Sequence, residues 1–299
     1  MAQLKKGTTI DGRDVMDELD SLITRIGNND ELDTTQKATL ILAINEINSK
    51  ANSNESTIDD LLSDLSEHKN KTAQSEDAPH GLNIGYRLAD IIYFRESGTF
   101  NKGDYPWLRA IRVTVLGGGG AGGGARSTGL GEVSGGSGGG GGGTAIKFIT
   151  ADSLNSTETV TVGSGGTGIN GDAGNRGGTS SFGSHCLAHG GDGGITRNAS
   201  NPPEIISSIN GGEAENGDLN IKGGVGHPPV LLQGRVVGGA GGDSLFGGGA
   251  RAISQSASQR LGDDSMQGAG GAGGASANNS SEVRGGHGGD GLVIVEVYA

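Results

Sequence analysis

Apolar residues recur along the first part of the chain with the spacing of amphipathic helices. Four of them follow one another at intervals of four, three and four residues: Val15, Leu19, Leu22 and Ile26. This spacing places them on one face of a short helix, and Gly27 is a residue type that commonly ends one. The pattern therefore predicts a helix within an N-terminal region of residues 1–30.

From residue 31 to residue 70 the spacing tightens into a heptad repeat. Eight positions alternate by fours and threes: Leu40, Ile44, Ile47, Ala51, Asn54, Ile58, Leu61 and Leu65. They are the a and d positions of a coiled coil, and one helix cannot bury such a seam alone. Ile44 at a and Ile47 at d favour more than two strands, and Asn54 at d fixes the register and the number of chains. We expect a trimeric coiled-coil shaft; the alternative is an antiparallel hairpin with the preceding helix.

After a polar linker of residues 71–90, the apolar residues change to a period of two. Alternation of β-branched residues is the signal of a strand. The runs with this character are 91–94, 108–116, 144–150, 158–163, 229–237 and 292–298. We expect strands there, within a domain of residues 91–299.

Between these expected strands lie about ten glycine clusters at irregular spacing. Only 7 of the 62 glycines fall in residues 1–115, and only 32% of the chain is hydrophobic, so an ordinary apolar core would be thin. The irregular period excludes collagen, which needs glycine at every third position. Glycine without a Cβ lets backbones approach closely. We therefore expect an α plus all-β fold: a helical part, then a β-sandwich with polyglycine-II-like segments whose insertions emerge as loops.

The net charge argues against one class of partner, and the cysteine content limits how the chain can be stabilised. The net charge of −12 argues against nucleic acid, which needs concentrated Lys and Arg. The one cysteine, Cys186, gives no intrachain disulfide framework, so oligomerisation is the expected source of stability. The N-terminal residues lack the apolar run of a signal peptide, which predicts synthesis in the cytoplasm without a secretion signal.

Several short stretches fit the residue pattern of a metal-binding or catalytic motif, but the surrounding sequence does not supply the spacing or partner residues that such a site needs. His185 and His189 in HCLAH are too far apart on a strand for one metal, so we interpret them as packing residues. Residues 238–246 and 285–293 fit a calcium-binding nonapeptide, which keeps a calcium-binding β-roll as an alternative. No nucleophile has an identifiable base partner. We therefore predict no enzymatic activity, no cofactor and no metal.

Several stretches resemble tail-fibre proteins of tailed bacteriophages. SGTFNKGDYPWLRAIRVTVLGGGGAGGG, ETVTVGSGGTG, GGTSSFG and GGHGGDGLVIVEVY look like the glycine-rich receptor-binding domain at the ends of such fibres, and DTTQKATLILAINEINSK is similar to their helical stretches. The resemblance covers about residues 33–50 and 97–299. It implies a protein of the virion that acts outside the host cell, docks by its N-terminus on another tail or baseplate component, and binds a polysaccharide or outer-membrane protein on the bacterial surface.

Loops on a rigid scaffold commonly carry binding residues, and the non-glycine insertions supply the candidates here. Their side chains can bond sugar hydroxyls, phosphates or protein loops. The candidate receptor-binding residues are Arg126, Arg197, Asn198, Asn201, His227, Arg235, Arg251, Gln255 and Arg260. The alternative to a receptor-binding homotrimer is a structural fibre spacer that binds no receptor.

Overall fold

The computed structural model describes residues 34–70, 86–201, 204–205 and 207–299, and four single positions before residue 34. The chain divides into two compact units, residues 1–85 and 86–299, which are treated separately below. No helix within the described residues combines the length and the apolar composition needed to cross a membrane.

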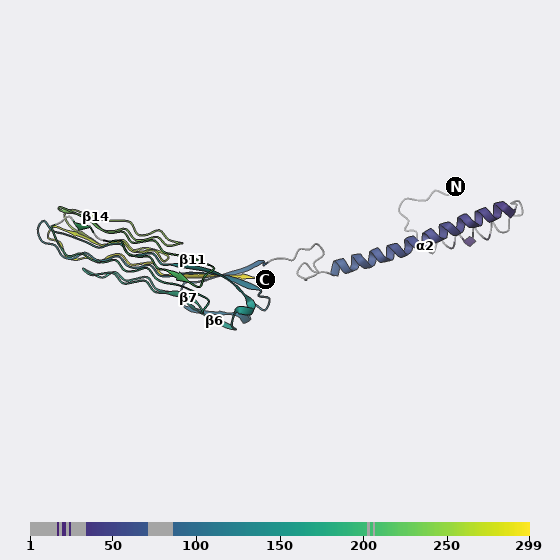
Figure 1. Cartoon of the computed structure of the whole chain (residues 1–299), viewed down its shortest axis with the longest axis horizontal. Coiled ribbons are helices and arrows are strands. Elements are labelled where there is room, and N and C mark those ends of the chain that lie inside the picture. Colours follow the sequence, from purple (N-terminus) through teal and green to yellow (C-terminus); the bar gives the residue numbers. More distant parts are fainter. Residues whose placement is uncertain are drawn as a thin grey trace. The chain divides into compact units, whose positions relative to one another are not determined.

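The described part of the first unit is helix α2 (Thr34–Asn70), a single helix of 37 residues (Figure 1). A helix over the expected shaft region is thus confirmed. The helix predicted within residues 1–30 lies outside the described residues except at four helical positions: Asp17, Asp20, Ser21 and Thr24. The linker predicted over residues 71–90 lies outside them up to residue 85.

Two five-stranded antiparallel sheets form one end of the second unit. In the first sheet the order is β1 (Leu88–Phe94), β17 (Leu292–Tyr298), β3 (Ala110–Leu116), β5 (Thr144–Thr150) and β11 (Leu219–Ile221). In the second it is β10 (Ala214–Glu215), β8 (Cys186–Ala188), β7 (Ser180–Phe182), β6 (Thr157–Thr161) and β2 (Gly98–Asn101). The predicted period-two runs therefore lie in β1, β3, β5, β6 and β17.

The main apolar core lies where these two sheets meet. The first sheet contributes the alternate residues of β3 and β17, such as Val113 and Val295, which pair across the two strands. The second contributes Phe100, Val160 and Phe182, all nearly inaccessible to solvent. Two short 3₁₀ turns, Lys102–Asp104 and Ala151–Ser153, close this end of the domain.

From this end, extended glycine-rich segments run side by side toward the other end of the domain (Figure 1). We call them the glycine core: residues 117–125, 136–143, 163–169, 172–178, 190–195, 209–212, 223–227, 238–242, 268–274 and 283–291. The segment 117–125 shows how they are joined. Successive N–H groups along this segment donate to three different neighbouring segments. Residues three apart therefore donate to the same neighbour, and the N···O distances are 2.8–3.0 Å. The three acceptor segments are 137–143, 172–178 and 283–289.

The same segment accepts hydrogen bonds from three more neighbours. Five carbonyls, those of residues 118–121 and 123, receive N–H groups from Gly166, from segment 191–194 and from segment 271–274. The segment 117–125 therefore has six hydrogen-bonded neighbours, whereas a strand in a sheet has two. Because main-chain hydrogen bonds leave the segment in several directions, they connect the segments of the glycine core in three dimensions. These bonds stabilise the interior of the domain, where apolar side chains are few.

The segments of the glycine core lie so close together that most positions have no room for a side chain, which explains why they are glycine. A Cβ on Gly119 would lie 1.8 Å from the carbonyl oxygen of Ala269, and a Cβ on Gly136 would lie 1.9 Å from that of Gly123. Both oxygens belong to the backbone, so no side-chain rotation could relieve the overlap. The core also contains a few alanines, such as the fully buried Ala121.

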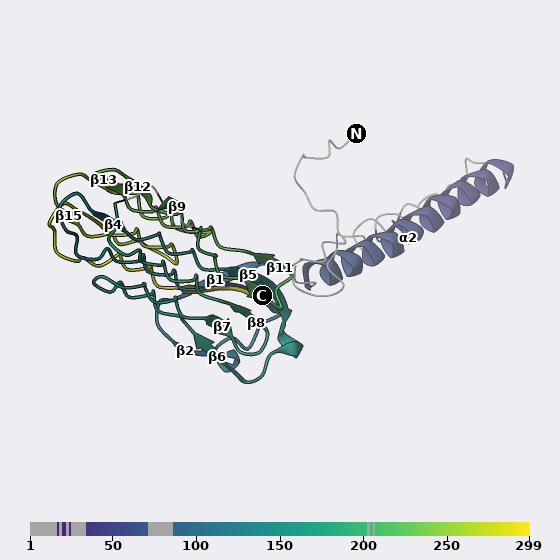
Figure 2. The ribbon, with the colours of Figure 1, turned by 60° about the vertical axis from the view of Figure 1, so that its left-hand side comes forward.

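Two small sheets occupy the far end of the domain, which we call the tip (Figure 2). One has the order β14 (Ser254–Gln255), β13 (Arg235–Val237), β12 (Val230–Leu232), β9 (Glu204–Ile205), and the other β15 (Gln259–Arg260), β16 (Ala275–Ala277), β4 (Val133–Gly135). The single strand predicted over residues 229–237 is wrong. It is a hairpin, because Gly234 has a φ of +67° and reverses the chain.

Replacing one interior glycine should test this packing. We expect Gly119→Ala to lower the free energy of unfolding by about 3 kcal/mol or more, because overpacking against rigid backbone is costly. The matched control is Gly248→Ala, at an exposed turn where an added Cβ meets only an Asp243 oxygen at 3.9 Å. Thermal unfolding should separate the two variants by about 10 °C. Equal melting temperatures would contradict the close packing.

Candidate functional site

The tip is held together by its own small apolar core. Six buried side chains from both tip sheets and the adjoining loops form it: Val133, Leu231, Val236, Ile253, Ala275 and Ala277. β12 and β13 pack against β4 in this cluster, and β13 also packs against β16. The loops between these strands are therefore fixed at both ends.

A buried serine connects two of the predicted loops. The Ser134 hydroxyl is inaccessible to solvent, accepts the Arg126 N–H at 2.8 Å and donates to the Arg197 carbonyl at 2.6 Å. Two residues near Arg197 form isolated bridges to β4 and to the residue that follows it: Ser200 pairs with Val133 and Thr196 with Gly136. The first loop, residues 126–134, and the loop around Arg197 thus lie side by side at the tip.

The structure brings most of the predicted receptor-binding residues to this end. Seven belong to tip strands or the loops beside them: Arg126, Arg197, Asn198, Asn201, Arg235, Gln255 and Arg260. The other two lie away from the tip, one in the glycine core and one beside it. The peptide of His227 belongs to it, bonded to Ala240 and Gly138, and Arg251 donates to Asp263 at 2.6 Å.

Sequence reasoning missed the apolar side chains that the tip exposes. Leu130 is 82% exposed, and Val230 and Leu232 on β12 are half exposed while Leu231 between them is buried. Arg126 and Arg235 are also exposed, and neither forms an ion pair within the described part of the chain. The apolar run Val230–Leu232 predicted a strand, but only the observed hairpin of β12 and β13 shows which of its side chains face solvent.

Charged residues on the flank of the glycine core neutralise one another. A hollow of about 350 Å³ is lined by two ion pairs and a histidine–carboxylate contact. The ion pairs join Arg176 to Asp192 at 3.3 Å and Lys222 to Glu213 at 3.2 Å, and the His189 ring lies 3.0 Å from Glu215. Because Arg176 and Lys222 each have a carboxylate partner, neither offers a free positive charge to an anionic ligand.

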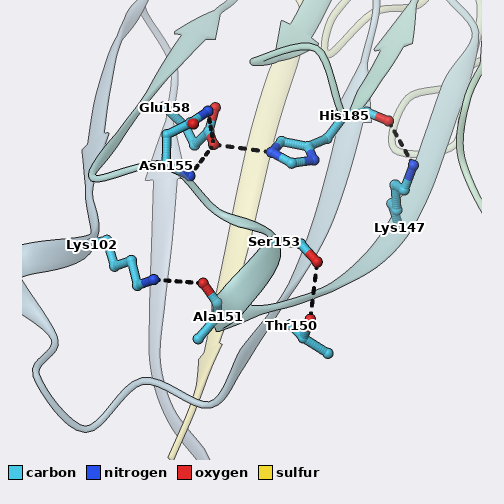
Figure 3. A network of polar contacts seen from close by, with 8 residues as sticks. All are labelled: Lys102, Lys147, Thr150, Ala151, Ser153, Asn155, Glu158 and His185. Atoms are coloured by element: carbon cyan, nitrogen blue, oxygen red, sulfur yellow. Dashed lines mark hydrogen bonds and ion pairs between the residues drawn. The ribbon is translucent and has the colours of Figure 1, made fainter.

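A polar network around strand β6 and the turn between β7 and β8 includes a buried carboxylate (Figure 3). Glu158 is buried and accepts bonds from the Asn155 N–H at 2.9 Å and the His185 ring at 3.0 Å. Burial alone would raise the pKa of Glu158, but these hydrogen bonds outweigh it and hold the pKa below its ordinary value of 4.5. Lys147 donates to the carbonyls of His185 and Asn216, both at 2.9 Å, which ties strand β5 to the second sheet.

The residues of the metal-like motifs bind other protein groups. His185 contacts Glu158, whereas His189 contacts Glu215, so the two rings serve different carboxylates. In the two calcium-like segments, Asp243 accepts the Gly249 N–H at 2.6 Å and Asp290 accepts the Gly165 N–H at 2.7 Å. In the described part of the chain, no group of three or more His, Cys, Asp and Glu side chains is placed to hold a metal ion.

A family model for a glycine-rich domain matches residues 95–298. The chain belongs to the glycine-rich domain family. The match covers more than half of the 299 residues and takes in the glycine core, the tip and every strand of the two large sheets except β1. It leaves out helix α2, so the glycine-rich domain and the helical part are distinct portions of the chain. Among curated proteins, none matches this chain.

Removing the Ser134 hydroxyl should loosen the tip of the glycine-rich domain. Ser134→Ala leaves the Arg126 N–H and the Arg197 carbonyl without their shared partner, at a cost of about 1–3 kcal/mol. Hydrogen exchange at the Arg126 amide should accelerate accordingly. Ser127→Ala, at an exposed position beside it, is the control and should leave that amide protected. Unchanged exchange in Ser134→Ala would show that the hydroxyl does not fix these loops.

Glu158 should make the stability of the domain depend on acid pH. Because the folded state lowers the pKa of Glu158, its contribution is complete above the pKa of the unfolded chain and is lost as the pH falls through the folded pKa. Urea unfolding between about pH 5 and pH 3 should therefore show a shallower loss of stability in Glu158→Gln than in the wild type. The exposed Glu282→Gln should keep the wild-type slope, and identical slopes in all three proteins would contradict the assignment.

Proposed function

We propose that this chain is a bacteriophage tail-fibre protein that recognises the host surface. Its N-terminal region attaches to another tail or baseplate component, helix α2 assembles into a trimeric coiled-coil shaft, and the glycine-rich domain presents its tip to the bacterium. The observation that carries the proposal is the tip itself: loops with exposed cationic and apolar side chains, anchored at one end of a rigid scaffold. The sequence resemblance to fibre domains agrees with it.

The exposure of the apolar heptad positions from Ile47 to Leu65 supports the shaft, whereas Ile44 is only 6% exposed in the single chain. Four apolar seam residues are at least half exposed in a single chain: Ile47, Ile58, Leu61 and Leu65. Exposed Leu and Ile at a and d positions are stabilised when copies of the helix bury them against one another. We infer that three copies do so, because isoleucine occupies both an a and a d position and Asn54 supplies a register-fixing polar residue.

The hydrogen-bond pattern of the glycine core supports a polyglycine-II scaffold arranged in layers. A period of three and six neighbours around one segment are what packed polyglycine-II helices have. Such a scaffold requires little apolar surface and is stiff along the segments. The insertions between segments are then free to vary in sequence while their ends stay fixed, which suits a recognition surface.

The chemistry of the tip favours an anionic partner. The whole chain carries a net charge of −12, yet Arg126 and Arg235 stand exposed at the tip without an ion pair to any described residue. Guanidinium groups bind phosphate and carboxylate in a fixed two-pronged geometry. Surface polysaccharides that carry such groups fit this arrangement, and the exposed Leu130 and Val230 add apolar contact.

The proposal is tested by competition for the host. Purified full-length protein should block adsorption of the phage that carries it, and Arg126→Gln with Arg235→Gln should weaken the block about tenfold or more, since each charge-assisted hydrogen bond contributes roughly 1.5–3 kcal/mol. Lys222→Gln removes an exposed positive charge from the flank of the core and is the matched control.

Two results would contradict parts of the proposal. Equal competition by the double variant and the control would move recognition away from these arginines. A wild-type protein that leaves adsorption unchanged would favour the structural spacer, because a receptor-binding protein in excess must occupy the phage receptors.

A further inference from the structure

The first sheet of the glycine-rich domain is apolar on both sides. Along β17, Val293, Val295 and Val297 are buried in the core, while Ile294, Glu296 and Tyr298 alternate with them on the other side. Residues paired directly across an antiparallel sheet share a face. By this rule the outer face carries apolar side chains on four strands, among them Ile91, Tyr93, Ile146, Phe148, Leu219, Ile294 and Tyr298.

The outer face exposes more apolar side chains than is usual for the solvent side of an antiparallel sheet. Tyr93 is 58% exposed, Leu219 53% and Phe148 39% in the single chain. An antiparallel sheet with one side in water normally alternates apolar and polar residues, and a contiguous exposed apolar patch marks an interaction surface. One ion pair interrupts the face, in which Arg112 donates to Glu296 at 2.9 Å.

Three aromatic rings give the face a preformed shape. Tyr86 meets Phe148 edge-on, with ring centroids 4.9 Å apart, and its ring centroid lies 6.4 Å from that of Tyr298. Phe148 and Tyr298 are 6.1 Å apart. Edge-to-face packing orders these rings before any partner arrives, which lowers the entropy cost of covering them.

We propose that the outer face packs against further copies of this chain, so that the glycine-rich domains associate with one another as well as the helices. The inference rests on the trimer proposed above. Tyr86 contributes to the face, and only 15 residues separate it from the end of α2. Joined helices therefore hold the outer faces of their domains at high local concentration, where moderate affinity suffices.

The composition of the face also fits a second copy better than a host molecule. It lies at the end of the domain opposite the tip (Figure 2). Its one ion pair is satisfied within the chain, so the remainder offers a partner apolar contact with little charge. Interfaces between identical subunits are rich in such apolar and aromatic surface.

Cysteine labelling of the full-length protein provides the test. The native chain has one cysteine, Cys186, whose thiol is buried with a pKa raised to about 11 by that burial, so an introduced thiol reacts selectively with maleimide at neutral pH. Tyr93→Cys and Leu219→Cys place a thiol on two different strands of the outer face. Met266→Cys, at a turn residue 74% exposed, is the control.

Sedimentation of each variant accompanies the labelling. We expect trimers in which Tyr93→Cys and Leu219→Cys react at least about tenfold more slowly than Met266→Cys, because a covered thiol reacts only when the interface opens. Adding Ile58→Lys and Leu61→Lys to each variant should break the helical seam. The resulting monomers should then label at the rate of the Met266→Cys control.

The outcomes distinguish the two proposals. Trimers whose outer-face thiols react as fast as the control overturn the outer-face interface and leave the shaft intact. A protein that sediments as a monomer before the seam is altered overturns both. Slow labelling that persists in seam-broken monomers would show that the chain's own residues cover the face, which overturns a second copy as its occupant.

Discussion

Hydrogen bonds between bare main-chain segments are the interaction on which this domain depends. Segment 117–125 donates hydrogen bonds to three neighbouring segments and accepts them from three others, all at normal hydrogen-bond distances. Side chains would force the segments apart, as the Cβ positions of Gly119 and Gly136 show. Ordering glycine is costly in backbone entropy, and the number of main-chain bonds, each with a modest net contribution, offsets that cost.

Within the described part of the glycine-rich domain, the two apolar cores lie where the glycine segments end. The two large sheets enclose one core around Val113, Val295 and Phe182, and the tip has a smaller one around Leu231 and Val236. Each fixes the chain where it enters or leaves the glycine core. The exposed loops of the tip are thus anchored by a scaffold to which they contribute few side chains, an arrangement in which loop chemistry can change without loss of the fold.

Much of the fold could be predicted where the pattern is local. The heptad repeat predicted helix α2. The alternating β-branched residues predicted strands β3, β5 and β17 with bounds within two residues of those observed. Strands of two residues, such as β14 and β15, have no periodic signal. The candidate site was predicted in part: loop arginines stood out by residue type, whereas the exposure of Leu130 and Leu232 depends on turns and pairings between distant segments.

The sequence by itself determined the division into a helical part and a glycine-rich part, and the need for main-chain bonding in place of an apolar core. Only the tertiary structure decided which glycine segment lies beside which, and hence which loops meet at the tip. The physical reason is that every glycine offers the same N–H and the same carbonyl, so composition encodes the kind of bond without encoding its partner. The choice of partner comes from the ends of the segments, where strand register and a buried hydroxyl such as that of Ser134 fix the alignment.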